Sequence, residues 1–476
     1  MPAHQQDEKS DSFQLSDNHR FLEMYSWFIL IVYMILSFIL GRRNHLYYLI
    51  FPFAVIQGPG AYIDPNMFSF GGLAATRDIL MVAYLWLALS LARPEMKNAR
   101  WNRLLALYAG YLLILLLISV LKLGFSWRVF SIFRIFIYIP LYYYCFTRIF
   151  ASVTKLQFIQ AVNAVFYINA LSSVLYILNS ANIFQVFPFD PWIVIEDGTR
   201  TFYRDLLTVP ILYGYVFLLS LVLFFNKEYL GIQKWIILLN VFLSLIVLFF
   251  TFTRGDVLNF TFIVIVLIAV NIVYSNSALI KKIAAIALVG IITAACLMVI
   301  SRMFPDQLAY FLSRYSSLES GLLQDGSFFY RVELMNRAWD TISLGTRDIL
   351  LLGTGFSQTE MVRMAEISGS WMGDTMWPFF LIFTGSVGTF LFLLLVLRAI
   401  LSSLKFYTKT GNLLFEFVFV VLIFHLLRTI NGPGFNDATG LAMIPFALLT
   451  IESNQMWQVE YWQIDGEYSE AACPTE

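Results

Sequence analysis

Residues 235–252 read WIILLNVFLSLIVLFFTF, and residues 257–274 read VLNFTFIVIVLIAVNIVY. The residues between them, 253–256, read TRGD. Each apolar run is close to the roughly 18 to 20 residues that an α-helix needs to cross the hydrocarbon core of a bilayer. The short polar connection is a turn, so this stretch predicts two long helices that cross a membrane in succession.

Runs of this kind recur along the whole chain, which is 59% hydrophobic and only 13% charged. They predict an all-α fold: a polytopic bundle of about 12 to 13 transmembrane helices, with a large outward-facing loop that contains amphipathic helices. Two runs either cross or re-enter the membrane, because 46–61 is broken by Pro52 and nearby glycines and 439–451 is short. The predicted spans are 21–40, 46–61, 77–92, 104–121, 129–147, 157–179, 206–225, 235–252, 257–274, 283–304, 377–400, 413–430 and 439–451.

These spans divide the chain into five regions. The regions are a polar N-terminal tail (1–20), the first ten transmembrane helices (21–304), a large outer loop (305–376), the C-terminal transmembrane helices (377–451) and a polar cytoplasmic tail (452–476). The N-terminal tail carries several acidic residues and lacks the pattern of a cleavable signal peptide. We therefore expect the first span to direct the protein to the membrane.

The composition argues against several classes of function. The formal net charge is +0, which does not indicate nucleic-acid binding, and Cys145, Cys296 and Cys473 form neither a disulfide framework nor a zinc-binding spacing. The chain has no glycine-rich nucleotide loop, which argues against an ATP-driven pump. The 4 histidines all lie outside the predicted outward loops. We therefore expect no cofactor, and no metal ion held by histidine at an outward site.

The basic residues of the short loops predict the orientation of the bundle, because lysine and arginine close to helix ends stay in the cytoplasm. The segment 93–103 is basic, and the alternate loops that follow hold Lys227 with Lys234, Lys281 with Lys282, and Lys405 with Lys409. The loops 180–205, 253–256, 305–376 and 431–438 should then face outward.

Arginine replaces lysine over a long part of the outward region. No lysine lies between Lys282 and Lys405, where seven arginines occur. Outward loops normally contain few basic residues. A guanidinium group binds phosphate or carboxylate with two parallel hydrogen bonds, which an ammonium group cannot do. The pattern therefore favours specific recognition of an anion.

The loop 180–205 ends with two arginines, Arg200 and Arg204, before a membrane helix. The N-terminus of a helix attracts anions, so these arginines are candidates for a pyrophosphate site there. The alternative is that they pair with Asp197 and Asp205.

Three further arginines lie in or beside the membrane. Arg254 stands in the TRGD turn, and either faces an inward pocket or pairs with Asp256. Arg134 and Arg428 lie within spans, near their outer ends, where a charge is costly enough to indicate function unless the side chain reaches the surface. His425, in the same span as Arg428, is expected to bond another helix.

The outer loop 305–376 contains two segments with helical periodicity, which predict amphipathic helices over the outer end of the bundle. Their apolar positions are Leu308, Phe311, Leu312, Tyr315 and Leu318, and then Phe328, Val332, Met335, Trp339 and Ile342. Arg331 lies beside the second stripe and is a candidate ligand for phosphate. Arg337 is a second candidate, but it can instead pair with Glu333 four residues before it.

Asp374 stands at the N-cap position of the next membrane helix, whose first turn contains Pro378. It either caps that helix or acts as a general base beside a basic pocket. The turn Gly353–Phe356 earlier in the loop is either structural or part of the site.

In their order along the chain, these motifs resemble the O-antigen polymerase and ligase superfamily over about residues 195–400. The matching features are Arg200 and Arg204, the turn at Thr253, Arg254 and Gly255, and Arg331 with Trp339 before the turn Gly353–Phe356. The resemblance implies a GT-C-type glycosyltransferase of the bacterial inner membrane that works on the periplasmic face without a metal ion. Its donor would be a polyprenyl-pyrophosphate-linked oligosaccharide, and its partners would be the bilayer, a chain-length regulator and a flippase.

The resemblance also implies roles for individual residues. The family arginines that bind pyrophosphate would correspond to Arg254 and Arg331, and also to Arg200 and Arg204. The residues themselves add Asp374 as the candidate general base, which would act in catalysis with Arg254 and Arg331. They also add Arg134, Arg337 and Arg428 as candidates for binding the substrate. Family ligases place a histidine, ten residues and then a glycine at the start of the helix after the loop. Here Asp374 replaces that histidine before Gly385, which favours a polymerase of O-antigen or exopolysaccharide. A ligase-type glycan transferase and a flippase or exporter of lipid-linked oligosaccharide are the alternatives.

Overall fold

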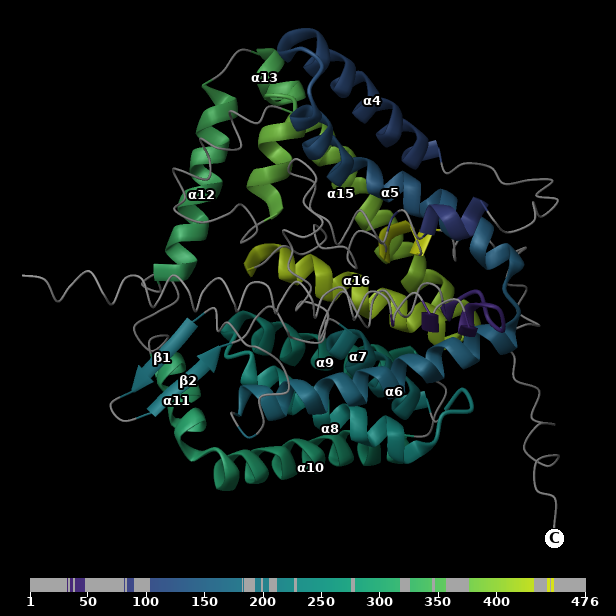
Figure 1. Cartoon of the computed structure of the whole chain (residues 1–476), viewed down its shortest axis with the longest axis vertical. Helices are drawn as coiled ribbons and strands as arrows, with labels where there is room; N and C mark the ends of the chain where they lie inside the picture. The colour runs from purple at the N-terminus through teal and green to yellow at the C-terminus, as the bar shows by residue number, and fades with distance from the viewer. Residues whose placement is uncertain are drawn as a thin grey trace, which may run out of the picture.

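The computed structural model describes residues 32, 35, 36, 39–47, 81, 84–89, 103–181, 183, 193–197, 200–204, 212–226, 229–274, 279–316, 326–344, 347–356, 376–431, 443–445, 447 and 448. Its helices are α4 (Arg103–Leu123), α5 (Trp127–Ser152), α6 (Lys155–Ser180), α7 (Leu212–Asn226), α8 (Lys234–Phe250), α9 (Arg254–Tyr274), α10 (Leu279–Met303), α11 (Pro305–Ser316), α12 (Gly326–Ser343), α13 (Arg347–Leu352), α15 (Met376–Thr410) and α16 (Leu413–Asn431). Two short antiparallel strands, β1 (Ile193–Asp197) and β2 (Arg200–Arg204), form a hairpin (Figure 1).

Apart from this hairpin the described chain is helical, and the protein is a multi-pass helical membrane protein, as its sequence predicts. Within the described ranges, 6 helices are long and apolar enough to cross a membrane, and α7 and α8 are apolar but shorter. The 6 candidate spans lie within α4, α6, α9, α10, α15 and α16. The predicted spans 21–40, 46–61, 77–92 and 439–451 fall largely outside the described residues.

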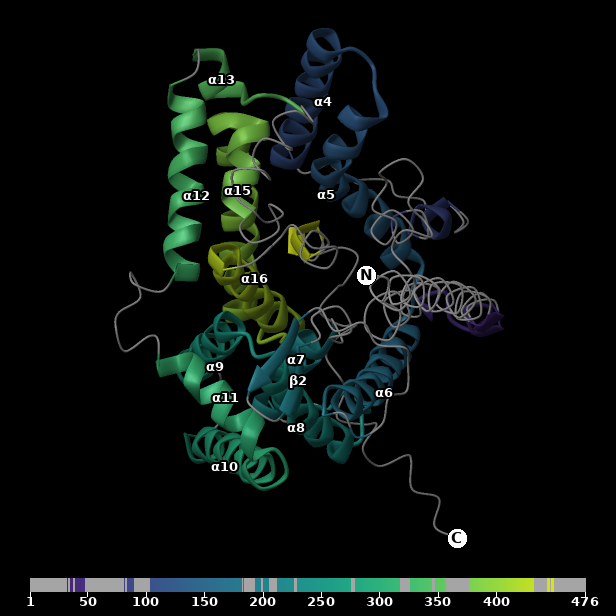
Figure 2. The ribbon, with the colours of Figure 1, turned by 60° about the vertical axis from the view of Figure 1, so that its left-hand side comes forward.

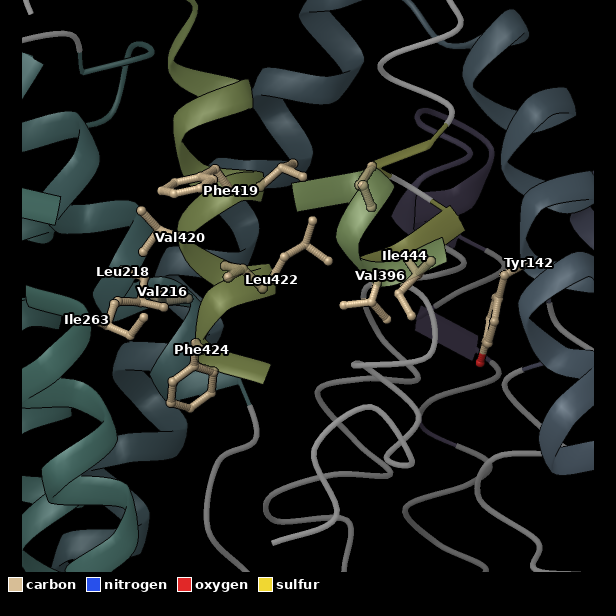
Figure 3. Packing of buried hydrophobic residues seen from close by; sticks show 14 of the residues in the cluster. Tyr142, Val216, Leu218, Ile263, Val396, Phe419, Val420, Leu422, Phe424 and Ile444 are labelled. Atoms are coloured by element: carbon tan, nitrogen blue, oxygen red, sulfur yellow. The ribbon is translucent and has the colours of Figure 1, made fainter. Parts of the chain in front are cut away.

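Helix α16 lies at the centre of the bundle and packs against α7, α9 and α15. Its buried side chains contact α7 and α9 on one side and face α15 on the other (Figure 3). The labelled residues are Phe419, Val420, Leu422 and Phe424 of α16, Val216 and Leu218 of α7, Ile263 of α9, Val396 of α15, and also Ile444 and Tyr142. This apolar core holds the helices that carry most of the polar residues discussed below.

At one end of the bundle, the buried carboxylate of Glu416 joins four helices. Its Oε2 accepts a 2.7 Å hydrogen bond from Asn226 Nδ2 of α7, and its Oε1 accepts one from Asn271 Nδ2 of α9. Glu416 is also hydrogen-bonded to Tyr407 of α15. We call this end the lysine end, because Lys405 and Lys409 of α15 flank Tyr407 there.

The opposite end is called the arginine end, because Arg254 begins α9 there and Arg428 lies in the last turn of α16. The hairpin β1–β2 and α11 lie at this end, on the left of Figure 1. The helix α12 lies there too, and runs crosswise to α8 and α10 in both Figure 1 and Figure 2.

Helix α15 is kinked at Gly385, whose φ of 62° falls in the left-handed region. The turn after α13 packs into this kink, where Thr354 N donates to Ile382 O (2.8 Å) and Ser386 Oγ donates to Leu350 O (2.9 Å). A Cβ atom added at Gly385 would collide with the backbone of Leu351 and Gly353. The close approach of the two chain segments therefore requires glycine.

The turn Gly353–Phe356 has a structural role, one of the two alternatives that the sequence left open. Gly353 and Gly355 adopt φ values of 74° and 72°. Phe356 is buried, and its backbone N–H donates to Ser119 Oγ of α4 at 3.0 Å. The turn therefore connects α13, α15 and α4.

The predicted apolar stripe of α12 is not the face that packs in the protein. Leu334, Ala338 and Ile342 are buried, and the last two contact Leu381 and Ile382 of α15. Of the predicted stripe, Ile342 alone among the residues whose burial is described is buried, whereas Val332, Met335 and Trp339 are exposed. The prediction failed because the apolar arc of this helix is wider than one contact, and sequence periodicity does not show which part of a wide arc meets a neighbour.

We expect Gly385→Ala to destabilise the protein more than Gly411→Ala. Both glycines have positive φ, at 62° and 66°, but an added Cβ at Gly411 has nothing within 4 Å. Gly411→Ala should therefore cost only the left-handed backbone penalty of about 1 to 2 kcal/mol. Gly385→Ala adds a backbone collision, so its loss should exceed about 4 kcal/mol. Thermal unfolding of the two purified variants measures the difference, and equal losses would show that the packing at the kink does not require glycine.

Candidate functional site

The TRGD turn begins α9 at the arginine end and positions a carboxylate between two helices. Thr253 Oγ1 donates a 3.0 Å hydrogen bond to Asp256 Oδ2, and Thr251 and Thr253 share a 2.6 Å hydroxyl contact. The other carboxylate oxygen, Asp256 Oδ1, lies 3.7 Å from Arg428 Nε of α16. Arg254 is half-buried at the first position of α9, two residues before Asp256.

The ion pair between Asp256 and Arg428 is only partly shielded from solvent. The side chain of Arg428 is 30% exposed and that of Asp256 is 19% exposed. A charge near the end of a membrane helix needs a partner or access to water, and this geometry supplies both. Arg428 therefore remains accessible to a ligand that approaches from the arginine end.

His425 lies less than one turn before Arg428 and is buried. Its Nε2 lies 2.6 Å from the hydroxyl of Tyr215 of α7. This contact confirms the prediction that His425 bonds another helix. It also fixes the rotation of α16 against α7, so that Arg428 stays at the α9 side of the bundle.

The first segment of α15, residues 376–384, contacts three helices that carry candidate arginines. Trp377 Nε1 donates a 2.9 Å hydrogen bond to Thr429 Oγ1, the residue after Arg428 on α16. On α5, Phe136 stacks on Phe379 with ring centroids 5.3 Å apart, and Arg134 lies two residues earlier, half-buried. The third helix is α12, which carries Arg331 and packs against α15.

Arg331 and Arg337 lie on the same helix but in different surroundings. Arg331 is half-buried, and its Nε is a buried atom without a hydrogen-bond partner among the described residues. Arg337 Nε donates to Glu333 Oε1 at 3.0 Å, and both side chains are exposed, at 47% and 41%. The structure thus confirms the pairing of Glu333 with Arg337. The buried Nε makes Arg331 the stronger candidate for binding an anion.

The first turn of α12, which precedes Arg331, lies close to the last turn of α16 in both views (Figures 1 and 2). Arg428 lies in that last turn of α16. The arginine-bearing ends of α9, α12 and α16 therefore lie near one another at one end of the bundle.

Two predicted site residues have a different local structure from the one expected. Arg200 and Arg204 do not begin a membrane helix but lie on the strand β2. In the backbone register of the hairpin, they stand opposite Asp197 and Ile193 of β1. Helix α7 begins only at Leu212. The prediction failed because the polar segment before the apolar run is long enough to form a hairpin of its own. Asp374 lies outside the described residues.

The contact between Asp256 and Arg428 is the main feature that sequence reasoning missed. Asp256 was considered only as a partner of the adjacent Arg254. The available signal was the cost of an arginine inside a span, which calls for a carboxylate on a neighbouring helix at the same depth. Among the described residues, no group of three or more His, Cys, Asp or Glu side chains is arranged to hold a metal ion.

A scan of the sequence against models of known protein families and a search of curated proteins find no match. The class that the fold and the site define is a multi-pass helical membrane protein with several arginines close to one end of its bundle.

We expect Asp256 and Arg428 to be energetically coupled. A double-mutant cycle with Asp256→Asn and Arg428→Gln should give a coupling energy of about 0.5 to 1.5 kcal/mol, since the residues are in contact and mostly buried. The exposed pair of Glu333 and Arg337 is the matched control and should give about 0.3 to 0.5 kcal/mol. Thermal unfolding of the purified variants provides these values. Additive effects of the two substitutions at Asp256 and Arg428 would show that the pair does not connect α9 and α16.

Proposed function

We propose that this protein polymerises polyprenyl-pyrophosphate-linked oligosaccharide repeat units into a surface polysaccharide, an O-antigen or an exopolysaccharide. The observation that supports this most directly is that Arg254 begins α9 and Arg428 lies in the last turn of α16, at one end of a membrane bundle. Arg331 follows the first turn of α12, which lies close to that last turn of α16. Arg134 lies on a fourth helix that contacts the same segment of α15. The order of the motifs, which resembles the O-antigen polymerase and ligase superfamily, supports the same proposal.

The arginines have the chemistry that a pyrophosphate leaving group requires. Pyrophosphate gains negative charge as its bond to the sugar breaks, and guanidinium groups that are already in position stabilise that charge. They also hold the donor in position for attack. Because Arg331 is half-buried, its guanidinium lies where the effective dielectric constant is lower than in water, and its attraction to an anion is therefore stronger there. The start of α9, beside Arg254, adds the positive end of a helix dipole.

In the proposed reaction, the bond between the anomeric carbon of the growing chain and the pyrophosphate oxygen breaks. A hydroxyl oxygen of the incoming lipid-linked unit forms the new glycosidic bond to that carbon. The hydroxyl proton passes to the carboxylate of Asp374, and polyprenyl pyrophosphate leaves with the electron pair of the broken bond. Asp374 precedes α15 by two residues, and Trp377 in the first turn of α15 bonds to the residue beside Arg428. This contact supports a base near the arginines.

The lysine end would face the cytoplasm and the arginine end the periplasm of a bacterial inner membrane. The support is the excess of lysine near the ends of α7 and α15, since lysine near helix ends remains in the cytoplasm. The substrate would enter from the bilayer, and a chain-length regulator and a flippase would act with the enzyme.

The decisive experiment uses the purified protein with polyprenyl-pyrophosphate-linked repeat units and a chelator. Gel electrophoresis and mass spectrometry should show a ladder of lengthened chains and release of polyprenyl pyrophosphate. A single transfer to another lipid acceptor would indicate a ligase instead. Unchanged substrate that crosses the bilayer of a proteoliposome would indicate a flippase.

Arg331→Lys should reduce polymerisation at least tenfold, whereas Arg337→Lys should keep at least half of the wild-type rate. Lysine keeps the positive charge but cannot form the forked contact with phosphate. Arg337 is the matched control because it lies on the same helix and already pairs with Glu333. The rates are compared at equal amounts of folded protein, and full activity of Arg331→Lys would refute the forked phosphate contact.

Asp374→Asn should abolish elongation while membrane abundance stays at the wild-type level. Asparagine caps a helix as well as aspartate does, so the substitution removes the base and keeps the cap. Abundance is measured by immunoblotting of membranes, and elongation by the ladder assay. If Asn supports elongation as well as Asp, the residue serves only as a cap.

A further inference from the structure

A second surface of α12 is apolar and exposed. Val332, Met335 and Trp339 are 39%, 39% and 52% exposed. Their spacing of three and four residues places them along one side of the helix. We call these three residues the apolar flank of α12. Phe329, 59% exposed, lies one turn before Val332.

The apolar flank lies between two other sides of the same helix. The side with Leu334, Ala338 and Ile342 is buried, and the last two of these residues pack on α15. The polar side carries Glu333, Arg337 and Asp340, which are all at least partly exposed. Packing inside the protein therefore accounts for only part of the apolar arc of α12. The described chain leaves the remainder exposed.

The direction of α12 indicates what this environment is. α12 runs crosswise to α8 and to α10, which contains a candidate span, and lies at the arginine end of the bundle (Figures 1 and 2). A helix that runs crosswise to membrane spans, near their ends, lies along the plane of the membrane surface. An amphipathic helix in that position buries its apolar side at the boundary between headgroups and acyl chains.

Three further observations favour lipid over a protein partner. The flank adjoins the contact of α12 with α15, which contains a candidate span and has exposed apolar side chains of its own, such as Phe390 at 58% exposure. Tryptophan, present here as Trp339, is enriched at membrane interfaces. The ion pair of Glu333 and Arg337 on the polar side is suited to water.

We propose that the apolar flank of α12 is embedded in the lipid leaflet at the arginine end, with the polar side of the helix facing water. The inference does not depend on the proposed reaction, because it concerns the contact of α12 with the bilayer alone.

The test uses the full-length protein with Cys145, Cys296 and Cys473 replaced by serine or alanine, reconstituted in nanodiscs of phosphatidylethanolamine and phosphatidylglycerol. Single cysteines at Val332, Met335 and Trp339 are spin-labelled, and Asp340→Cys is the matched control on the polar side. Power saturation then compares collision with oxygen, which concentrates in lipid, and with a nickel chelate, which stays in water. Wild-type-like gel filtration and thermal stability are required of each variant before labelling.

We expect the ratio of oxygen to nickel collision to be at least threefold higher at the three flank positions than at position 340. Ratios at the flank positions that are as low as at a water-exposed position 340 would overturn the proposal by placing the flank in water. Broadening of the spectra at the flank positions that disappears on mixing with unlabelled protein would also overturn it, because the flank would then contact a second copy of this chain.

Discussion

The arrangement of the arginine end depends on one close contact, between the backbone at Gly353 and the kink of α15 at Gly385. A side chain at either glycine would collide with the backbone of the other segment, so both positions are restricted to glycine. The kink turns residues 376–384 away from the direction of the rest of α15, and this first segment then contacts α5, α12 and α16. The same turn is tied to α4 through Ser119. This first segment of α15 is thus a common neighbour of the helices that carry Arg134, Arg331 and Arg428.

Much of the fold could be predicted from the sequence. A segment that crosses a bilayer must hydrogen-bond all of its backbone groups within the protein, and a long apolar segment does this most simply as an α-helix. The runs 235–252 and 257–274 accordingly correspond to α8 and α9. The pairing of Glu333 with Arg337 was also predictable, since residues four apart on a helix are neighbours wherever the helix lies.

The predictions that failed depend on packing, which a local pattern does not contain. The buried side of α12 is set by the position of Leu381 and Ile382, which lie on a helix that is distant in sequence. Arg200 and Arg204 were expected at a helix terminus, but strand pairing with residues 193–197 gives their backbone a different set of hydrogen bonds. The contact of Asp256 with Arg428 joins two helices, and it can be predicted only when the relative position of α9 and α16 along their axes is known. The first and third of these features become visible only when the neighbouring helix is placed, and the second only when the two strands are paired.

The polar residues at the two ends of α16 differ in how accessible they are to a ligand. Glu416 is 0% exposed, and donors from α7 and α9 already occupy both of its oxygens. A carboxylate so fully bonded and closed to solvent has no room for a ligand, so its effect is to hold helices together. Arg428 meets its carboxylate at 3.7 Å and is 30% exposed, which is a looser and more open contact. An anion with more charge than one carboxylate can compete for this arginine, whereas nothing comparable can reach Glu416. The difference in access, more than the presence of charge in the membrane, therefore favours the arginine end over the lysine end as a place where an anionic ligand can bind.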